Sequence, residues 1–139
     1  MSAKEMDTAL NKQSGLLGIS GVSSDSRDIE DGISNGDERC ILAQKMYVKR
    51  IVDFIAKYYV ELGGCDAIIF TAGVGENSIS TRMEVMEKLA CLGVKPDEER
   101  NNVRGKEALI SADNSKIPVY VIPTNEELMI ATDTYNLAK

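Results

Sequence analysis

The chain has 139 residues, of which 43% are hydrophobic and 27% are charged, and its formal net charge is −6. This length and hydrophobic content suit one domain with a modest core, and the negative charge argues against nucleic acid or an anionic membrane as a partner. The chain has no histidine, no hydrophobic run of transmembrane length and a polar start unlike a signal peptide, so we exclude histidine-based catalysis within it and expect a cytoplasmic protein.

The N-terminal part predicts two short helices separated by a glycine-rich segment. A first helix is expected over residues 3–13. The apolar, glycine-rich segment 16–22 is expected to form a close-packed loop or turn. Ser24 or Asp25 can then cap a second helix that continues to about Ser34, because both side chains can accept hydrogen bonds from the first helical N–H groups.

A long helix is predicted from about Arg39 to Leu62. Its apolar residues recur every three or four positions, which places them on one face, and Gly63 with Gly64 supplies the C-terminal stop. Part of this face must cover the sheet, and we expect the remainder to support association. The apolar positions are Val48, Ile51, Val52, Ile55, Tyr58, Tyr59 and Leu62.

The C-terminal half predicts alternating strands and helices. Strands are expected over residues 67–71, 108–111 and 119–122, with a helix over 78–91 and a charged surface segment over 95–107. A last helix follows, with Thr124 as its cap and Glu127 completing a capping box. Together these elements predict an α/β fold with helices packed on a small, mostly parallel sheet.

The three cysteines, Cys40, Cys65 and Cys91, are widely spaced and form no CxxC pair. Their odd number and spacing favour reduced, mostly buried thiols.

The most informative segment is the glycine-containing turn from Phe70 to Ser78, which follows a short apolar strand. Gly73 and Gly75 allow positive φ and leave the backbone N–H groups open to a ligand, and the start of the following helix favours a phosphate. The pattern matches neither the dinucleotide-binding fingerprint nor a Walker loop. Taken alone, it is better explained as an ordinary strand-to-helix turn.

Two further candidate sites carry charge. Asp25 can accept a ribose hydroxyl and Arg27 can stack on adenine, although from the residues alone a helix cap with a surface ion pair between Arg27 and Glu30 is the better explanation. Glu126 offers a hard oxygen ligand for Mg²⁺. An acidic residue near a helix N-terminus also stabilises the helix dipole without any metal.

Several sequence blocks together resemble the C-terminal part of acetate kinase and its relative propionate kinase. The resemblance covers the whole chain and implies a partial C-terminal lobe of the actin-like ATPase (acetate and sugar kinase) fold, as a single domain over residues 1–139. The N-terminal lobe would be missing. The matching blocks are residues 12–21, 23–30, 70–78, 102–105 and 122–131.

The resemblance also implies roles for particular residues. Asp25, Ser26 and Arg27 match the stretch that contacts the adenosine end of ATP, although Ser26 replaces a bulkier apolar residue common in the family. Glu126 matches a residue that helps to hold the catalytic magnesium. The phosphates of ATP or ADP would be held by the segment comprising Gly73, Val74, Gly75, Glu76 and Asn77.

The implied reaction is reversible phosphoryl transfer between ATP and acetate, which yields acetyl phosphate and ADP. The family's catalytic arginines, histidine and carboxylate pocket match nothing in this chain, so we expect the isolated chain to be inactive. We expect Arg82 and Arg104 to lie on solvated faces. The alternatives are a non-enzymatic remnant or interaction domain, or the same lobe of a propionate or butyrate kinase. The family also implies a homodimer.

Overall fold

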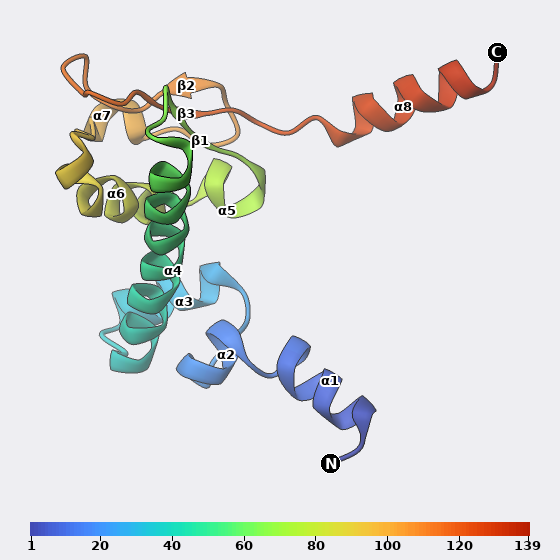
Figure 1. Ribbon diagram of the computed structural model, residues 1–139. Helices are drawn as coiled ribbons and strands as arrows, with labels where there is room; N and C mark the ends of the chain where they lie inside the picture. The colour runs from blue at the N-terminus through green and yellow to red at the C-terminus, as the bar shows by residue number, and fades with distance from the viewer. The chain divides into compact units, whose positions relative to one another are not determined.

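The computed structural model describes residues 1–139, which form two compact units, residues 1–64 and residues 65–139. Figure 1 shows the elements in chain order, coloured from the N-terminus to the C-terminus.

The first unit is entirely helical. Its long helix α4 begins after the cap Asp37, whose carboxylate accepts hydrogen bonds from two backbone N–H groups, and ends at Gly63, which has a φ of 71°. Asp25 caps α3 with one such hydrogen bond, from the Arg27 N–H. The segment predicted as a loop over 16–22 is instead largely the short helix α2, so that prediction is wrong. The helices are α1 (Ala3–Lys12), α2 (Gly15–Ser20), α3 (Ser26–Ser34) and α4 (Glu38–Leu62).

The core of the first unit lies where α3 packs on the N-terminal half of α4. Ile29 from α3 and Cys40, Ala43 and Val48 from α4 are fully buried. Gly32 permits this close packing, because a Cβ added there would lie 2.4 Å from the Cys40 sulfur. Burial raises the pKa of the Cys40 thiol.

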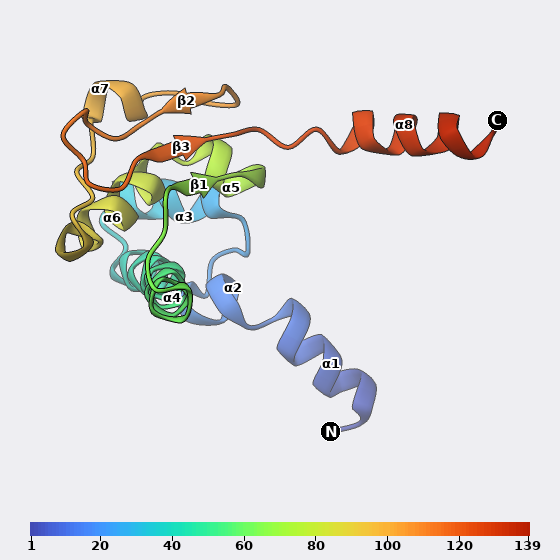
Figure 2. The ribbon, with the colours of Figure 1, turned by 45° about the horizontal axis from the view of Figure 1, so that its top comes forward.

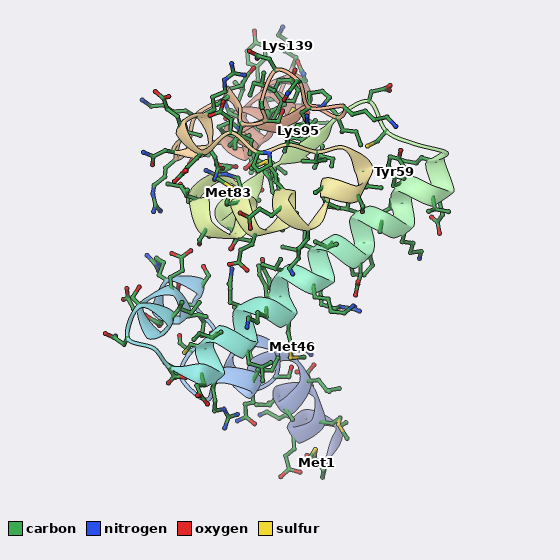
Figure 3. All side chains as sticks on the ribbon, turned by 90° about the vertical axis from the view of Figure 1, so that its left-hand side faces the viewer. Met1, Met46, Tyr59, Met83, Lys95 and Lys139 are labelled. Carbon is green, nitrogen blue, oxygen red and sulfur yellow. The ribbon has the colours of Figure 1, made fainter.

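The C-terminal half of α4 has no buried residue. Tyr59, labelled in Figure 3, is half-buried, whereas Phe54, Tyr58 and Leu62 are exposed. The predicted apolar face therefore exists, but only its N-terminal part is fully covered.

The second unit contains a three-stranded sheet in the order β1-β3-β2. β1 pairs with β3 in parallel, with Ile68 opposite Val119, and β2 pairs with β3 antiparallel. The sheet is thus small and mixed, and the unit has the predicted α/β character. The strands are β1 (Ile68–Phe70), β2 (Ala108–Leu109) and β3 (Val119–Val121).

The other elements of the second unit are helices, and side chains from its strands, helices and loops form a hydrophobic core. The predicted helix over 78–91 is divided into α6 and a 3-10 turn, and the preceding glycine turn forms the additional short helix α5. The helices are α5 (Ala72–Asn77), α6 (Ile79–Lys88), η1 (Ala90–Leu92), α7 (Glu98–Asn101) and α8 (Glu126–Leu137). The core residues are Ile68, Phe70, Val85, Met86, Leu89, Val94, Ile110, Ile117, Val119 and Val121.

The last helix, α8, has no buried residue and lies at the C-terminal end of the ribbon in Figure 2. Asn125, not Thr124, is its cap, and its side chain accepts a hydrogen bond from the Leu128 N–H. The predicted capping box between Thr124 and Glu127 is therefore wrong. None of the helices combines the length and the hydrophobicity that a membrane-spanning helix requires.

The three cysteines are free thiols in different environments: Cys40 is buried, Cys65 is half-buried and Cys91 is exposed. The prediction of free thiols is confirmed, but only one of them is fully buried.

Candidate functional site: a braced glycine turn

The glycine turn follows β1 directly and forms the short helix α5. Its unusual backbone conformation is at Ala72, whose φ is 58°, and not at Gly73 or Gly75, which do not have positive φ. The freedom of these two glycines to adopt positive φ is therefore not used in this turn. A left-handed conformation is unfavourable for alanine, so the turn holds strained backbone at its first residue.

The two glycines of the turn have different surroundings. A Cβ added to Gly75 would lie 3.3 Å from the Phe70 carbonyl carbon, so Gly75 permits the turn to pack against the end of β1. A Cβ added to Gly73 would meet no atom within 4 Å. Gly73 therefore borders open space, where a ligand can approach the backbone without contacting a side chain.

Arg82 of α6 lies beneath this turn. Its side chain is fully buried, with 0% exposure, so the prediction that Arg82 lies on a solvated face is wrong. Its Nη1 donates to the Gly75 carbonyl at 3.0 Å and its Nε to Asn101 Oδ1 at 2.9 Å. Its Nη2 donates to the carbonyls of Asn101 and Val103 at 2.8 and 2.7 Å. One guanidinium thus joins the turn to the last residue of α7 and to the loop that follows it.

Helical spacing explains why Arg82 is buried. It precedes Val85 and Met86 by three and four positions, so it shares the inward face of α6 with these two core residues. Burial, and to a lesser extent the charge of Arg104, lowers the pKa of Arg82 from its ordinary value. The spacing of apolar residues in the sequence already placed Arg82 on the inward face of this helix. A charged residue on such a face is, however, normally expected to reach solvent.

The same loop makes two more contacts with the turn. Arg104 Nη1 donates to the Asn77 carbonyl at 2.7 Å, and the Gly105 N–H donates to the Glu76 carbonyl at 3.2 Å. Arg104 is exposed, as predicted. Inside the turn, Asn77 Nδ2 donates to the Gly73 carbonyl at 2.9 Å. The Asn77 amide therefore stabilises the turn in this structure.

Glu76 connects the turn to the segment before α8. Its Oε1 accepts hydrogen bonds from the Thr124 N–H at 2.9 Å and the Thr124 hydroxyl at 3.2 Å. This contact explains why Thr124 does not cap the helix. It also fixes the segment two residues before Glu126, which is exposed at the first position of α8.

The structure contains no group of three or more Asp, Glu, Cys or His side chains suited to a metal ion. An acidic hollow lined by Ile79, Glu98, Glu99 and Asn102 is unsuited to a phosphate because of its charge.

Asp25 and Arg27 lie in the other unit and form a close ion pair. Arg27 Nη2 donates to Asp25 Oδ2 at 2.6 Å and Arg27 Nε to Oδ1 at 3.1 Å, while the Arg27 N–H donates to Oδ1 at 2.9 Å. The partner of Arg27 is thus Asp25, not Glu30. The hydrogen bonds from Arg27 lower the pKa of Asp25 from 3.8 to about 2. Ser26 between them is half-buried.

The structure thus brings together one predicted group, the turn from Gly73 to Asn77 with the segment leading to Glu126. The pair Asp25–Arg27 belongs to residues 1–64, whereas the turn belongs to residues 65–139. Sequence reasoning missed the contributions of Arg82, Asn101 and Thr124.

The chain is similar in sequence to one known protein family and to individual acetate kinases. The family model described as the Acetokinase family matches residues 1–132. The acetate kinase of Finegoldia magna is 55% identical over 138 residues, a match that covers 99% of this chain and 35% of the relative. The acetate kinase of Phocaeicola vulgatus is 55% identical over 134 residues, covering 96% of this chain and 34% of that relative.

Crystal structures show the same fold. The structure of Porphyromonas gingivalis acetate kinase has a TM-score of 0.91 at 46% identity and covers 100% of this chain and 35% of its own. A propionate kinase from Francisella tularensis has a TM-score of 0.85 at 40% identity, covering 94% and 33%. The chain spans about a third of the length of these relatives. The match over residues 1–132, with the shared actin-like ATPase fold, shows that the chain belongs to the acetokinase family.

Proposed function

We propose that this chain is the nucleotide- and magnesium-binding part of an acetate kinase, a phosphotransferase that moves a phosphoryl group reversibly between ATP and acetate. The observation that carries the proposal is the turn at Gly73, which borders open space and is held in place by Arg82 and Glu76. The named acetate kinases at 55% identity support the substrate. Residues 1–139 would then form one part of the C-terminal lobe of the complete enzyme.

The turn would bind the phosphates of ATP or ADP through the backbone, chiefly at Gly73 and Val74, because no side chain blocks the approach at Gly73. Glu76 and Asn77 would act on the shape of the turn, since their side chains already bond to Thr124 and the Gly73 carbonyl. Asp25, Ser26 and Arg27 would contact the adenosine end. Arg27 is suited to this role because its side chain is 85% exposed.

Glu126 would hold the magnesium ion that accompanies the nucleotide. Mg²⁺ in phosphotransferases is commonly held by one or two carboxylates together with substrate phosphates and water, so a single exposed carboxylate near the turn fits. When bound, the ion neutralises phosphate charge. The link between Glu76 and Thr124 would keep Glu126 close to the turn.

A propionate kinase is the second candidate. The Francisella tularensis propionate kinase covers 94% of this chain with a TM-score of 0.85, so the fold described here fits either substrate. Homodimer formation, supported by the exposed Phe54 and Tyr58 of α4, and a cytoplasmic location belong to the same proposal.

Catalysis would need residues outside this chain. The chain has no histidine, and none of its arginines matches a catalytic arginine of the family. We therefore expect no acetyl phosphate from the chain by itself in a hydroxylamine trapping assay with ATP and acetate. Turnover that Glu126→Ala abolishes would show that the chain is active alone.

Nucleotide binding is tested by placing a methyl group in the open space at Gly73. We expect the 139-residue chain to bind MgATP weakly, with a Kd near 1 mM, about −4 kcal/mol, since only part of the cleft is present. Changes in the amide chemical shifts of Gly73 and Val74 during a titration with MgATP would measure this binding. Gly73→Ala should weaken binding about tenfold without lowering the urea midpoint.

Gly75→Ala is the matched control, because its methyl group would press on Phe70 and not enter the open space. It should lower stability more than affinity. The phosphate site would be overturned if Gly73→Ala bound MgATP as tightly as the wild type. It would also be overturned if MgATP shifted only amide signals outside the turn in the wild-type chain.

A further inference from the structure

Arg82 is a buried cation whose hydrogen-bond acceptors are all uncharged. Three are backbone carbonyls, of Gly75, Asn101 and Val103, and the fourth is the amide oxygen of Asn101. The Asn101 amide is itself fixed, because its Nδ2 donates to the Ile79 carbonyl at 3.0 Å. The side chain thus has good geometry but no carboxylate to balance its charge.

We propose that Arg82 is a positioning residue for phosphate binding: it holds the Gly73–Asn77 turn against residues 101–105, which are the end of α7 and the loop after it, and a bound phosphate balances its charge. This inference rests on the proposed function, since it assumes that the turn receives a phosphate. It assigns Arg82 no contact with the phosphate. Arg82 acts through the Gly75 carbonyl and through its electric field.

Geometry supports the positioning part of the proposal. The guanidinium has a planar, rigid set of donors, and here these donors reach the turn at Gly75 and the loop at Asn101 and Val103 at once. The Gly75 carbonyl is therefore turned toward the protein interior. A lysine has one flexible ammonium group and cannot reproduce this arrangement.

Charge supports the second part. A buried charge without a counter-ion is unfavourable, and neutral dipoles compensate it only in part. The neighbouring cation Arg104, which donates to the Asn77 carbonyl of the same turn, adds to the positive potential. The two arginines thus favour an anion at a turn whose Gly73 borders open space.

A purely structural role is the competing explanation, and two substitutions separate it from the proposal. Arg82→Gln removes both the charge and the fork of donors. Asn101→Asp leaves the backbone acceptors of Arg82 in place and introduces a carboxylate beside Nε, so the charge is balanced without any ligand. It also removes the Nδ2 donor to the Ile79 carbonyl, so its urea midpoint is measured together with its affinity. A structural brace would tolerate Asn101→Asp with no change in anion affinity, whereas a phosphate-directed charge would not.

The experiment titrates the full chain with inorganic pyrophosphate and follows the amide signals of Gly73 and Gly75, with the folded fraction measured by urea unfolding. We expect Arg82→Gln and Asn101→Asp each to raise the Kd about tenfold, and Arg82→Lys to lie between Arg82→Gln and the wild type. Arg100→Gln is the matched control, because Arg100 also holds a loop, through Ser111 and Asp113. It should leave the Kd unchanged.

The outcomes are distinguishable. If the wild-type chain shows no pyrophosphate-dependent shifts at the turn, the proposed phosphate site and this inference both fail. If the wild type binds and a folded Asn101→Asp chain binds equally well, only the inference about Arg82 fails. Should Arg82→Gln not fold, Asn101→Asp still decides, because it retains the guanidinium and its contacts to the turn.

Discussion

Each compact unit contains one arginine near a proposed nucleotide contact, and these two arginines, Arg27 and Arg82, are held in opposite ways. Arg27 is 85% exposed and is paired with a carboxylate, Asp25, at 2.6 Å. Arg82 is fully buried and bonds only to neutral oxygens. The exposed arginine has a counter-ion that water already screens, whereas the buried one has none.

The difference teaches how each arginine can serve a ligand. Arg27 can turn toward a nucleotide by exchanging Asp25 for a new partner, at little cost in a solvated ion pair. Arg82 cannot move without breaking contacts to Gly75, Asn101 and Val103 together. The first is suited to contact a ligand directly, and the second to shape the backbone that does so.

The largest effect expected from this comparison concerns stability. Arg82→Met leaves several buried carbonyls without donors, so we expect the free energy of unfolding to fall by about 3 kcal/mol or more. The measurement is urea denaturation followed by circular dichroism. Arg27→Met, the matched substitution at the exposed site, should leave the urea midpoint unchanged. Equal losses in the two variants would remove the distinction between them.

A smaller effect is expected from strain in the turn that Arg82 supports. Ala72 has a φ of 58°, which is unfavourable for any side chain with a Cβ. Ala72→Gly should therefore raise the free energy of unfolding by about 1 kcal/mol, measured by the same denaturation. A loss of stability would mean that the alanine methyl group contributes more than the strain removes.

The link on the other side of the turn should contribute less. Thr124→Val removes the hydroxyl that donates to Glu76 at 3.2 Å but keeps the backbone N–H bond at 2.9 Å. We expect a loss of about 0.5 kcal/mol in the free energy of unfolding. Thr134→Val, on the exposed face of α8, is the control. If Thr124→Val lowered the free energy of unfolding as much as Arg82→Met does, the contact of Glu76 with Thr124 would be the main stabilising contact of the turn.

The smallest effect is a change in titration at the exposed pair. Asp25 should titrate with a pKa of about 2, and Arg27→Gln should return it toward 3.8. Because folding lowers this pKa, the carboxylate's stabilising contribution is present above pH 3.8 and is lost as the pH falls toward 2. NMR titration of the Asp25 carboxyl carbon measures it. Asp113, paired with Arg100, should not change. An unchanged Asp25 pKa in Arg27→Gln would show that the pair does not persist in solution.

Local signals allowed the sequence to predict much of this molecule. The cap at Asp25, the long helix ending at Gly63 and the position of the glycine turn all depend on residues close in sequence. The sites of error depend on distant partners. Arg82 bonds to Asn101 across 19 positions and Glu76 to Thr124 across 48. No periodicity or capping rule reports such contacts, because they arise only when the elements pack.

The contact between Gly32 and Cys40 has a further practical consequence. Because the Cys40 thiol is fully enclosed and its pKa is raised, a thiol reagent can reach it only when α3 separates from α4. Exposed Cys91 reacts without such an opening. The rate at which Cys40 is modified, relative to that of Cys91, therefore measures how often residues 1–64 open transiently.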